Sequence, residues 1–472
     1  MQQALESPSA ESITGRLMQH IEEHHSRLRQ APLNTDTSPQ EIRQHLEATY
    51  SLDGPLPIQQ VFEDVTGMLW KWSEHARNPM HFGLTRPTVD LASIVADTIA
   101  ALYDPNLATW DFSPSANEIE RFVLDRLASC FGYAPGEGVS HFTSGGQEAN
   151  HTAVTVALTH LFPDFRCGGL RSLPGQPVLY LSQEGHHSFE KSVHSSGLGR
   201  SAIRRIAVGE DLKMKVGALL EQIEMDRRSG HLPFMVAATA GTTNAGAIDP
   251  LAELAEVARH YSMWFHADAA WGGAAALSER LRPLLDGIER ADSVTFDAHK
   301  WLSVPVGAGA FFCRHRTAVE AAFSTDAEYV PEKSGSQRVY PYAASMQWSR
   351  RFIGLKVFMM LAVRGMPEIV RRIEHQSDLA QLMARLLTER GWRILNRPEM
   401  AVVCFSHARI EQGKVSAAQI VRRIKGSQTA WISHTLLAGK TVALRASVTN
   451  FETRRSDIER LVQALHQAVF EL

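Results

Sequence analysis

Between about residues 90 and 320, short apolar runs alternate with stretches of helical periodicity. Several runs lack the polar alternation of a half-exposed strand, and helical stretches such as DPLAELAEVARHYS (249–262) separate several of them. Strands buried on both faces are typical of a mostly parallel sheet covered by helices on both sides. We therefore predict an α/β fold with strands at PVLYLS (177–182), FMVAATAG (234–241), MWFHADAA (263–270), SVTFDA (293–298) and GAGAFFC (307–313).

The segments on either side of this region have a different texture. Apolar residues recur at helical spacing in the first 50 residues (Ile13, Leu17, Ile21), which predicts an amphipathic arm that packs on something else. After about residue 357, a helix-rich stretch leads to two strand-like runs and a final amphipathic helix. We predict an N-terminal helical arm used in dimerisation (1–90), a large cofactor-binding domain (91–357) and a small C-terminal α+β domain (358–472).

The composition excludes several classes of function. The 472 residues carry a net charge of −3 with scattered basic residues, so we expect neither nucleic acid nor a membrane surface as a partner. No apolar stretch approaches the roughly 20 residues of a membrane span, and the N-terminus lacks a signal-peptide pattern. The four cysteines are far apart and form no CxxC pair, which predicts free thiols and a cytoplasmic protein.

A metal site is not expected. His20 and His24 lie four residues apart on one helical face, a spacing that two metal ligands can use. The segment is not an HExxH motif, and no third ligand is evident. We interpret the two histidines as part of a solvated helix face.

One polar segment at a predicted strand end is HADAA (266–270), and parallel sheets bind ligands at such ends. Side chains alternate along a strand, so His266, Asp268 and Ala270 share a face. A buried carboxylate is costly unless it meets a positive partner. On this motif alone, Asp268 is equally consistent with a functional role and with a structural one, as a helix cap or the partner of an arginine.

Three further segments supply a phosphate cradle, an imidazole and an amine. TSGGQEAN (143–150) is a glycine-rich turn before a helix, where exposed amides bind anions, although many turns have this composition. EGHHSFEKS (184–192) places paired histidines after a strand, either on the surface or stacked on a flat ring. DAHKWLS (297–303) places Lys300 at the mouth of a strand, where it either caps the element in solvent or does chemistry.

Together the four segments match one cofactor, pyridoxal 5'-phosphate. Its aldehyde bonds to a lysine, and its pyridine nitrogen stays protonated when it pairs with an aspartate. Its phosphate needs a cradle, and its ring needs a stacking partner. We therefore predict a pyridoxal-phosphate site in which Lys300 anchors the cofactor.

The chain resembles the group II pyridoxal-phosphate decarboxylases, the family of the aromatic-L-amino-acid, glutamate and cysteine-sulfinate decarboxylases. The resemblance covers about residues 60–450 and rests on TSGGQEAN, EGHHSFEK, ATAGTTNAGAIDP, WFHADAAWGG and DAHKWLSVP. It implies the type I fold of pyridoxal-phosphate enzymes and a homodimer with its active site at the subunit interface. It also implies that the reaction removes the α-carboxylate of an L-amino acid.

The same motifs imply a role for each matching residue. Lys300 would bind the cofactor aldehyde, Asp268 the pyridine nitrogen, and Thr239 would lie near the phenolic oxygen. Ala270 and His186 would lie against opposite faces of the ring. The phosphate would be held by Ser144, Gly145, Gly146, Gln147 and His299. Gln147 departs from the small residue usual in the family, but its N–H can still donate.

Tyr329 is the residue from which we predict the reaction product. It lies in STDAEYVPEKSGSQRVY (324–340), where the family carries a loop tyrosine that protonates the substrate Cα, although an ordinary loop tyrosine is the alternative. Phenylalanine there accompanies aldehyde formation in relatives, so Tyr329 predicts an amine. The alternatives are an aldehyde synthase, another enzyme of the same fold, and a non-catalytic scaffold, against which the intact motif residues argue.

The segment HFGLTRPTVDLA (81–92) bears on the substrate. Leu84, Thr85 and Arg86 stand where aromatic decarboxylases carry ring-contacting residues, and a guanidinium there favours a carboxylate or other anionic side chain. The alternative is that Arg86 pairs with an acid such as Asp90. Arg445 matches a family arginine that either meets the α-carboxylate of the substrate or braces the domain interface.

Overall fold

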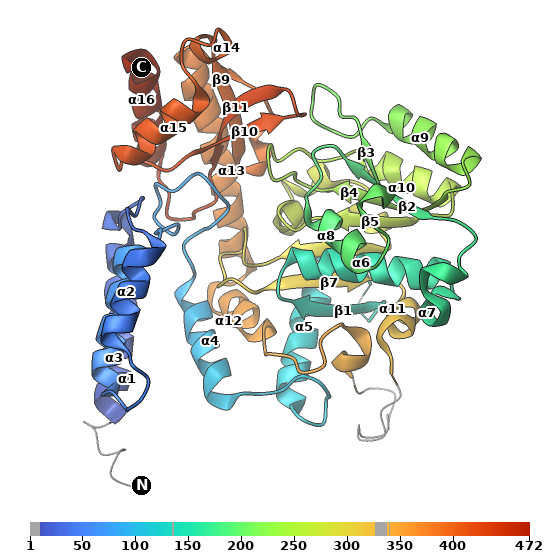
Figure 1. Ribbon diagram of the computed structural model, residues 1–472, viewed down its shortest axis with the longest axis horizontal. Helices are drawn as coiled ribbons and strands as arrows, with labels where there is room; N and C mark the ends of the chain where they lie inside the picture. The colour runs from blue at the N-terminus through green and yellow to red at the C-terminus, as the bar shows by residue number, and fades with distance from the viewer. Residues whose placement is uncertain (1–9, 135, 326–337, 339) are drawn as a thin grey trace.

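The computed structural model describes residues 10–134, 136–325, 338 and 340–472 (Figure 1). Its largest element is a seven-stranded sheet in the order β1-β7-β6-β5-β4-β2-β3. Strands β2 to β6 run parallel, whereas β7 is antiparallel to both β1 and β6. The strands are β1 (Val139–Thr143), β2 (Pro177–Ser182), β3 (Ile203–Ile206), β4 (Leu232–Thr239), β5 (Trp264–Asp268), β6 (Ser293–Asp297) and β7 (Gly309–Cys313). The predicted α/β fold is confirmed.

Helices cover both faces of this sheet, and the strands supply apolar side chains to each face in turn. Along β2, Val178 and Tyr180 pack into one core, while Leu179 and Leu181 pack into another. The helices of the first face are α5 (Pro114–Cys130), α9 (Val216–Arg228) and α10 (Leu251–His260). The helices of the second face are α6 (Gly146–Leu161), α8 (Ser188–Ser195) and α11 (Arg316–Phe323), and the short α7 (Phe165–Gly168) follows α6. This double cover explains why the strands lack polar alternation.

A second, antiparallel sheet lies in the C-terminal part of the chain, in the order β10-β11-β9-β8. Its strands are β8 (Trp392–Ile394), β9 (Val402–His407), β10 (Ser433–Leu437) and β11 (Thr441–Ser447). Its helices are α14 (Ala408–Glu411), α15 (Ala417–Gly426) and α16 (Arg455–Glu471), and α12 (Gly354–Arg364) and the long α13 (Met366–Glu389) lead into it. A capping box between Ser416 and Gln419 fixes the start of α15.

Three helices form an arm along one side of the molecule (Figure 1). They are α1 (Ala10–Arg27), α2 (Pro39–Thr49) and α3 (Ile58–Trp72), and α4 (Leu91–Tyr103) follows them. Arg27 of α1 lies 4.5 Å above the ring of Trp70 in α3, and His45 of α2 lies 2.9 Å from Asp64 of α3. The three helices therefore hold one another through side chains on their facing surfaces.

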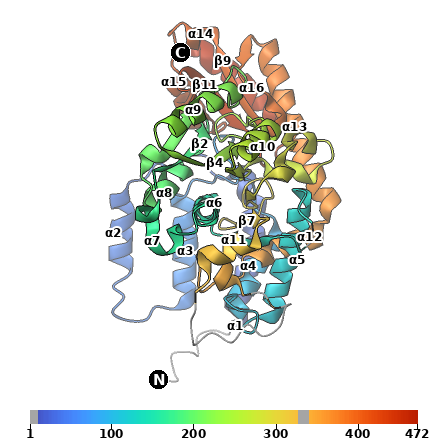
Figure 2. The ribbon, with the colours of Figure 1, turned by 90° about the vertical axis from the view of Figure 1, so that its right-hand side faces the viewer.

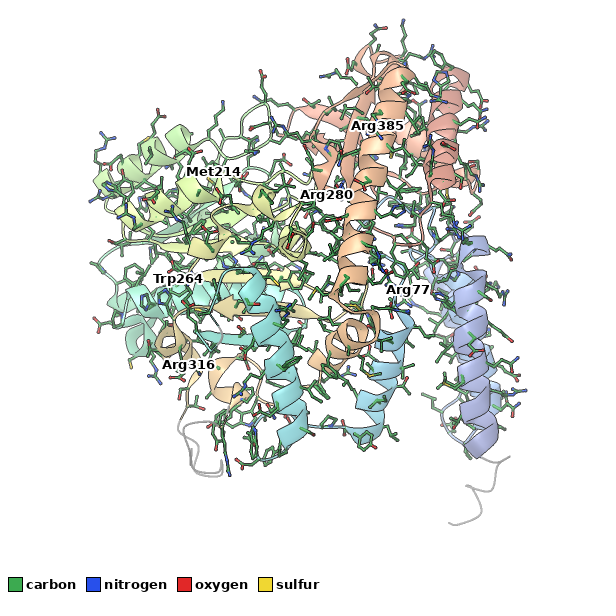
Figure 3. The ribbon with its side chains drawn as sticks, turned by 180° about the vertical axis from the view of Figure 1, so that it is seen from behind. Arg77, Met214, Trp264, Arg280, Arg316 and Arg385 are labelled. Carbon is green, nitrogen blue, oxygen red and sulfur yellow. The ribbon has the colours of Figure 1, made fainter. Side chains whose placement is uncertain are left out.

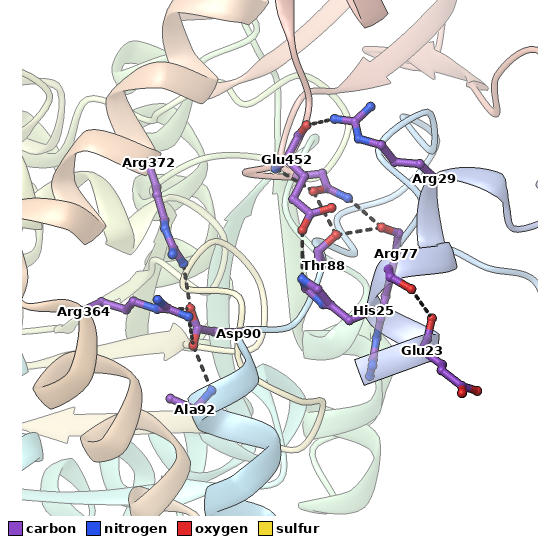
Figure 4. Close-up of polar contacts among 12 residues, drawn as sticks. Glu23, His25, Arg29, Arg77, Thr88, Asp90, Ala92, Arg364, Arg372 and Glu452 are labelled. Carbon is purple, nitrogen blue, oxygen red and sulfur yellow. Dashed lines mark hydrogen bonds and ion pairs between the residues drawn. The ribbon is translucent and has the colours of Figure 1, made fainter. Parts of the chain in front are cut away.

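Ion pairs fasten the long α12 and α13 to earlier parts of the chain. The buried Asp90 accepts from Arg364 at 2.8 Å and from Arg372 at 2.9 Å (Figure 4). From the large domain, Arg280 reaches α13 and lies 2.7 Å from Asp378 (Figure 3). The two bonds to Asp90 fix the segment that precedes α4, which is the predicted substrate segment. Within the described ranges, no helix is both long and apolar enough to cross a membrane.

Candidate active site

Three polar side chains end neighbouring parallel strands at the centre of the large sheet. Thr239 ends β4, Asp268 ends β5 and Asp297 ends β6. The register pairs Thr239 with Asp268, and Asp268 with Thr295 of β6. All three side chains are buried. They therefore lie together at the rim where such a sheet binds its ligand.

Lys300 reaches this rim from the turn after β6. Its Nζ lies 2.9 Å from Oδ2 of Asp297, and 26% of its side chain is exposed. The other carboxylate oxygen of Asp297 is buried and has no hydrogen-bond partner in the described part of the chain. The amine is thus held by a buried carboxylate and remains open to a ligand. Asp297 was not among the residues predicted from the sequence, because a carboxylate three residues before a lysine is common in turns.

The carboxylate of Asp268 accepts hydrogen bonds from uncharged donors rather than from a cation. Its Oδ2 accepts from Asn150 Nδ2 at 3.0 Å, and its Oδ1 accepts from the Ala270 amide at 3.2 Å. Neither an arginine nor a lysine forms an ion pair with this carboxylate among the described residues. A buried carboxylate without a cation is costly unless a ligand supplies the positive charge. Of the two structural alternatives, the pairing with an arginine is therefore wrong, while the bond from the Ala270 amide is a local backbone contact of the capping kind.

The glycine-rich turn before α6 is crowded against the Lys300 segment. A Cβ on Gly146 would lie 2.9 Å from Asp297 Oδ2 and 3.2 Å from the Ala270 Cβ. A Cβ on Gly309 would lie 2.5 Å from the Gly145 Cα. Only glycine permits this approach, which brings the N-terminus of α6 onto the rim. Figure 2 shows α6 end-on near the centre of the molecule.

The first turn of α6 leaves amides available to an anion. Glu148 and Ala149 donate to the Gly145 carbonyl, whereas the amides of Gly146 and Gln147 have no acceptor within the described ranges. The Gln147 side chain is turned toward α8, where it donates to Ser188 O and Ser192 Oγ at 3.2 Å each. The long Gln147 side chain therefore leaves the space at the glycine-rich turn free. Free amides at a helix N-terminus are suited to a phosphate.

Ser144 is engaged differently from the other residues of the turn. Its amide and hydroxyl donate to Glu148 Oε2 at 2.8 and 2.7 Å. The other Glu148 oxygen accepts from Gln347 at 2.7 Å. Sequence analysis did not identify Glu148, whose charge lies next to the predicted phosphate site.

Two histidines lie near the rim as largely neutral rings. Burial lowers the pKa of His186 and that of His299 below the ordinary value. His186 Nδ1 accepts from the Ser188 amide at 3.1 Å, and His299 Nδ1 accepts from the Ala308 amide at 3.3 Å. In each ring, a neutral imidazole therefore carries its proton on Nε2.

Thr239 has an unused hydroxyl. Its Oγ1 is buried without a hydrogen-bond partner in the described chain. Its amide donates to Asp249 Oδ2 at 2.8 Å, and the same carboxylate accepts from the Met214 amide at 2.8 Å. The strand end is thus fixed through the backbone, and the hydroxyl is left for a ligand atom.

Two residues of the predicted substrate segment are exposed, and the third is partly exposed. Leu84 is 41% exposed, Arg86 is exposed and Thr85 is partly exposed. The alternative in which Arg86 pairs with Asp90 is wrong, because Arg364 and Arg372 bind that carboxylate. Burial opposes the charge of Asp90, but the two arginines outweigh it and lower the pKa of the carboxyl.

Arg445 of β11 lies at the junction of the two sheets and is buried. Its Nε donates to the carbonyls of Thr243 and Asn244 at 3.0 Å each. Its Nη1 donates to the Gly83 carbonyl at 2.7 Å, next to Leu84. These bonds brace the domain interface, and they also place the guanidinium beside the substrate segment.

Tyr329, the predicted proton donor, lies outside the residues that the structure describes. The interpretation of His20 and His24 as part of a solvated helix face is wrong, because both rings are only partly exposed and pack edge-on against α3. The ring centroids are 5.6 Å apart for His20 and Phe62 and 5.7 Å apart for His24 and Trp70. No three histidine, cysteine, aspartate or glutamate side chains gather as metal ligands within the described ranges.

The family follows from a comparison with known proteins. A family model described as the pyridoxal-dependent decarboxylase conserved domain matches residues 39–408. The chain belongs to this family. It is therefore a pyridoxal-phosphate-dependent amino-acid decarboxylase, as its sequence motifs predict.

The similarity to individual relatives covers most of the chain. The chain is 29% identical over 453 residues to the aromatic-L-amino-acid decarboxylase of Bacillus atrophaeus, covering 94% of this chain and 92% of the relative. It is 31% identical over 374 residues to the human cysteine sulfinic acid decarboxylase, covering 78% and 74%. The crystal structure of mouse CSAD matches with a TM-score of 0.87 at 26% identity, covering 98% of this chain and 99% of that one.

The rim of this decarboxylase fits pyridoxal phosphate. The site has a lysine amine that is open to a ligand, a buried carboxylate without a cation, an unused hydroxyl and free amides at a helix start. These are the groups that the aldehyde, the pyridine nitrogen, the phenolic oxygen and the phosphate require. When bound, the cofactor withdraws electrons from the substrate Cα and so allows the bond to the carboxylate to break.

Proposed function

We propose that this decarboxylase converts an L-amino acid with an acidic or polar side chain into its amine and CO2. The observation that carries the proposal is the convergence of Lys300, Asp268 and Thr239 on the ends of three neighbouring strands. The predicted phosphate turn meets the same point, because Gly146 is crowded against Asp297 and Ala270.

Each site residue has one task in this proposal. Lys300 anchors the cofactor aldehyde, and Asp297 orients the Lys300 amine. Asp268 faces the pyridine nitrogen and stabilises its proton, because a carboxylate favours a positive partner. Ala270 and His186 hold the ring between them, and Thr239 donates toward the phenolic oxygen. The phosphate is held by Ser144, Gly145, Gly146, Gln147 and His299.

The product follows from the proton donor. We assign the protonation of the substrate Cα to Tyr329, because it matches the loop tyrosine to which the family resemblance gives this role. A tyrosine there delivers a proton after CO2 leaves, and the product is an amine. The measured ratio of amine to CO2 tests this assignment, because oxidative conversion would release an aldehyde in place of the amine.

The acidic substrate class has two supports. Arg86 is exposed in the substrate segment and does not pair with Asp90, which two other arginines bind. The charge of Arg86 does act on Glu74, whose pKa is lowered mainly by His81 and less by Lys425 and Arg86. The human relative at 31% identity is named for an acidic substrate, cysteine sulfinic acid. We place Leu84, Thr85 and Arg86 around the substrate side chain, and Arg445 beside its α-carboxylate.

We further propose a cytoplasmic homodimer with its active site at the subunit interface. The arm helices carry large apolar side chains that are exposed in the single chain, such as Ile58 (56%) and Leu69 (59%). A second subunit would cover them. This proposal keeps the arm at 1–90, the large domain at 91–357 and the small domain at 358–472.

A decarboxylation screen tests the proposed function. Purified protein with added pyridoxal phosphate is offered each proteinogenic amino acid, cysteine sulfinate, 2,4-diaminobutyrate, ornithine and dihydroxyphenylalanine, and both CO2 and amine are quantified. CO2 with equal amine from an acidic substrate supports the proposal. The same result from an aromatic substrate only would overturn the substrate class, and CO2 with aldehyde would overturn the role of Tyr329.

A further inference from the structure

A chain of buried hydrogen bonds ends on Asp268. Asn150 of α6 donates through Nδ2 to Asp268 Oδ2 at 3.0 Å. Asn150 Oδ1 lies 3.1 Å from His266 Nε2, and His266 Nδ1 lies 2.8 Å from Ser293 Oγ. Ser293 Oγ accepts from the indole N–H of Trp264 at 2.8 Å. All five side chains are buried.

The two ends of this chain and a neutral His266 together fix the direction of every hydrogen bond in it. An indole N–H can only donate, and an ionised carboxylate can only accept. Asn150 uses Nδ2 for Asp268, so its Oδ1 faces His266 Nε2, which must donate. A neutral His266 ring then accepts at Nδ1 from Ser293, which itself accepts from Trp264. A fully satisfied buried network of this kind specifies one arrangement.

The burial of His266 supports its neutral state. Its ring is completely buried, and burial lowers the pKa of His266 to about 4. A neutral ring carries one N–H, and the network uses it at Nε2. The hydroxyl of Thr295 lies farther from the same nitrogen, at 3.4 Å.

Asn150 also reaches the segment of His186. Its Nδ2 donates to Ser188 Oγ at 2.9 Å, and the Ser188 amide donates to His186 Nδ1. One amide thus contacts the aspartate strand and the start of α8, and it lies one helical turn after Gly146. No other described side chain donates to the Asp268 carboxylate.

We propose that Asn150 and His266 are positioning residues, which hold the Asp268 carboxylate toward the pyridine nitrogen of the cofactor. His266 fixes the rotamer of the Asn150 amide, and Asn150 fixes the plane of the carboxylate. The proposal rests on the proposed role of Asp268. It extends the site by two residues that touch neither the cofactor nor the substrate.

The test measures the affinity of the apoenzyme for pyridoxal phosphate and the visible spectrum of the complex. Asn150→Leu removes the donor at similar size, and we expect it to weaken cofactor binding roughly tenfold to a hundredfold, as for a lost bond to a charged group. Thr152→Val is the matched control, because the buried Thr152 hydroxyl in the same helix donates to Glu148 O of its own helix and, among the described residues, to no other group. We expect the control to bind as the wild type does.

Two further variants separate positioning from simple packing. His266→Gln keeps an N–H donor and should retain most of the affinity, whereas His266→Leu should weaken it like Asn150→Leu. Asn150→Asp places two carboxylates together, so binding should be weak at high pH and recover as the pH falls, because the introduced acid donates once protonated. A packing defect has no such pH dependence.

The outcomes distinguish this proposal from the role on which it rests. Unchanged affinity and spectrum in Asp268→Asn would overturn the role of Asp268 itself. Weak binding in Asp268→Asn, together with wild-type binding in Asn150→Leu and His266→Leu, would overturn the positioning proposal alone. If Asn150→Leu does not fold, the pH profile of Asn150→Asp decides: a flat profile overturns the proposal.

Discussion

The Nζ of Lys300 lies 2.9 Å from the buried carboxylate of Asp297, which is the last residue of β6. We predict that Asp297→Asn lowers kcat/KM roughly tenfold to a hundredfold, because a charge-assisted bond that orients the amine is lost. Steady-state kinetics on the substrate from the screen measures this. Asp292→Asn is the control, since Asp292 precedes the same strand and pairs with His315. An equal loss in both variants would contradict the orienting role.

The assignment of Lys300 as the residue that binds the cofactor aldehyde is tested by making their bond irreversible. We predict that treating the loaded enzyme with borohydride reduces the bond between Lys300 and the cofactor, so that the cofactor stays attached on denaturation. Mass spectrometry of the digested protein should find it on the peptide that contains Lys300. Lys300→Ala should show no attached cofactor, while a variant that still carries it would place the anchor on another lysine.

The strands that could be predicted from the sequence are those buried on both faces. The five predicted runs correspond to β2, β4, β5, β6 and β7, which are buried along their length apart from the partly exposed first two residues of β4. Sequence analysis did not identify β3, whose Arg204 and Arg205 are half-buried at the sheet edge. It did not identify β1 either, and the antiparallel direction of β7 has no local signal.

The residues of the candidate site also fall into two groups, those that sequence motifs predict and those that only the fold brings together. Lys300, Asp268 and the glycine turn were identified because each lies in a short segment with its own chemical pattern. Asn150 and Asp268 are 118 residues apart in sequence, and their contact follows from the packing of α6 on β5. Asp297 is close to Lys300, but a carboxylate at that spacing is common in turns. Such partners become visible only in three dimensions.

Asp90 joins the substrate segment to α12 and α13 through Arg364 and Arg372 (Figure 4). We predict that Asp90→Asn lowers the free energy of unfolding by about 2–3 kcal/mol, since the charge-assisted bonds from two arginines to a buried carboxylate are weakened. Urea denaturation measures this. Asp378→Asn, which breaks an exposed pair with Arg280, should change it by about 1 kcal/mol or less. Similar values for both would show that Asp90 is no more important than a surface pair.

The stability of the apoenzyme should depend on the pH through His266. Its pKa is about 4 in the folded protein and about 6.5 in an unfolded chain. The unfolded chain therefore binds more protons between these values, so the contribution of His266 is present above pH 6.5 and is lost as the pH falls toward 4. The advantage of the wild type over His266→Gln should shrink by about 2 kcal/mol between pH 8 and pH 5. Urea denaturation at both values measures it, and a constant difference would contradict the prediction.

Arg86 should determine which substrates bind. Its guanidinium is exposed beside Leu84, and Asp90 is already bound by two other arginines. We predict that Arg86→Ala raises KM for an acidic substrate roughly tenfold to a hundredfold, because a charge-assisted contact is lost, and changes KM for a neutral substrate little. Arg259→Ala is the control, since Arg259 is exposed on α10 and pairs with Glu256. Equal increases for the acidic and the neutral substrate would exclude recognition of an anionic side chain by Arg86, because the loss would then not depend on substrate charge.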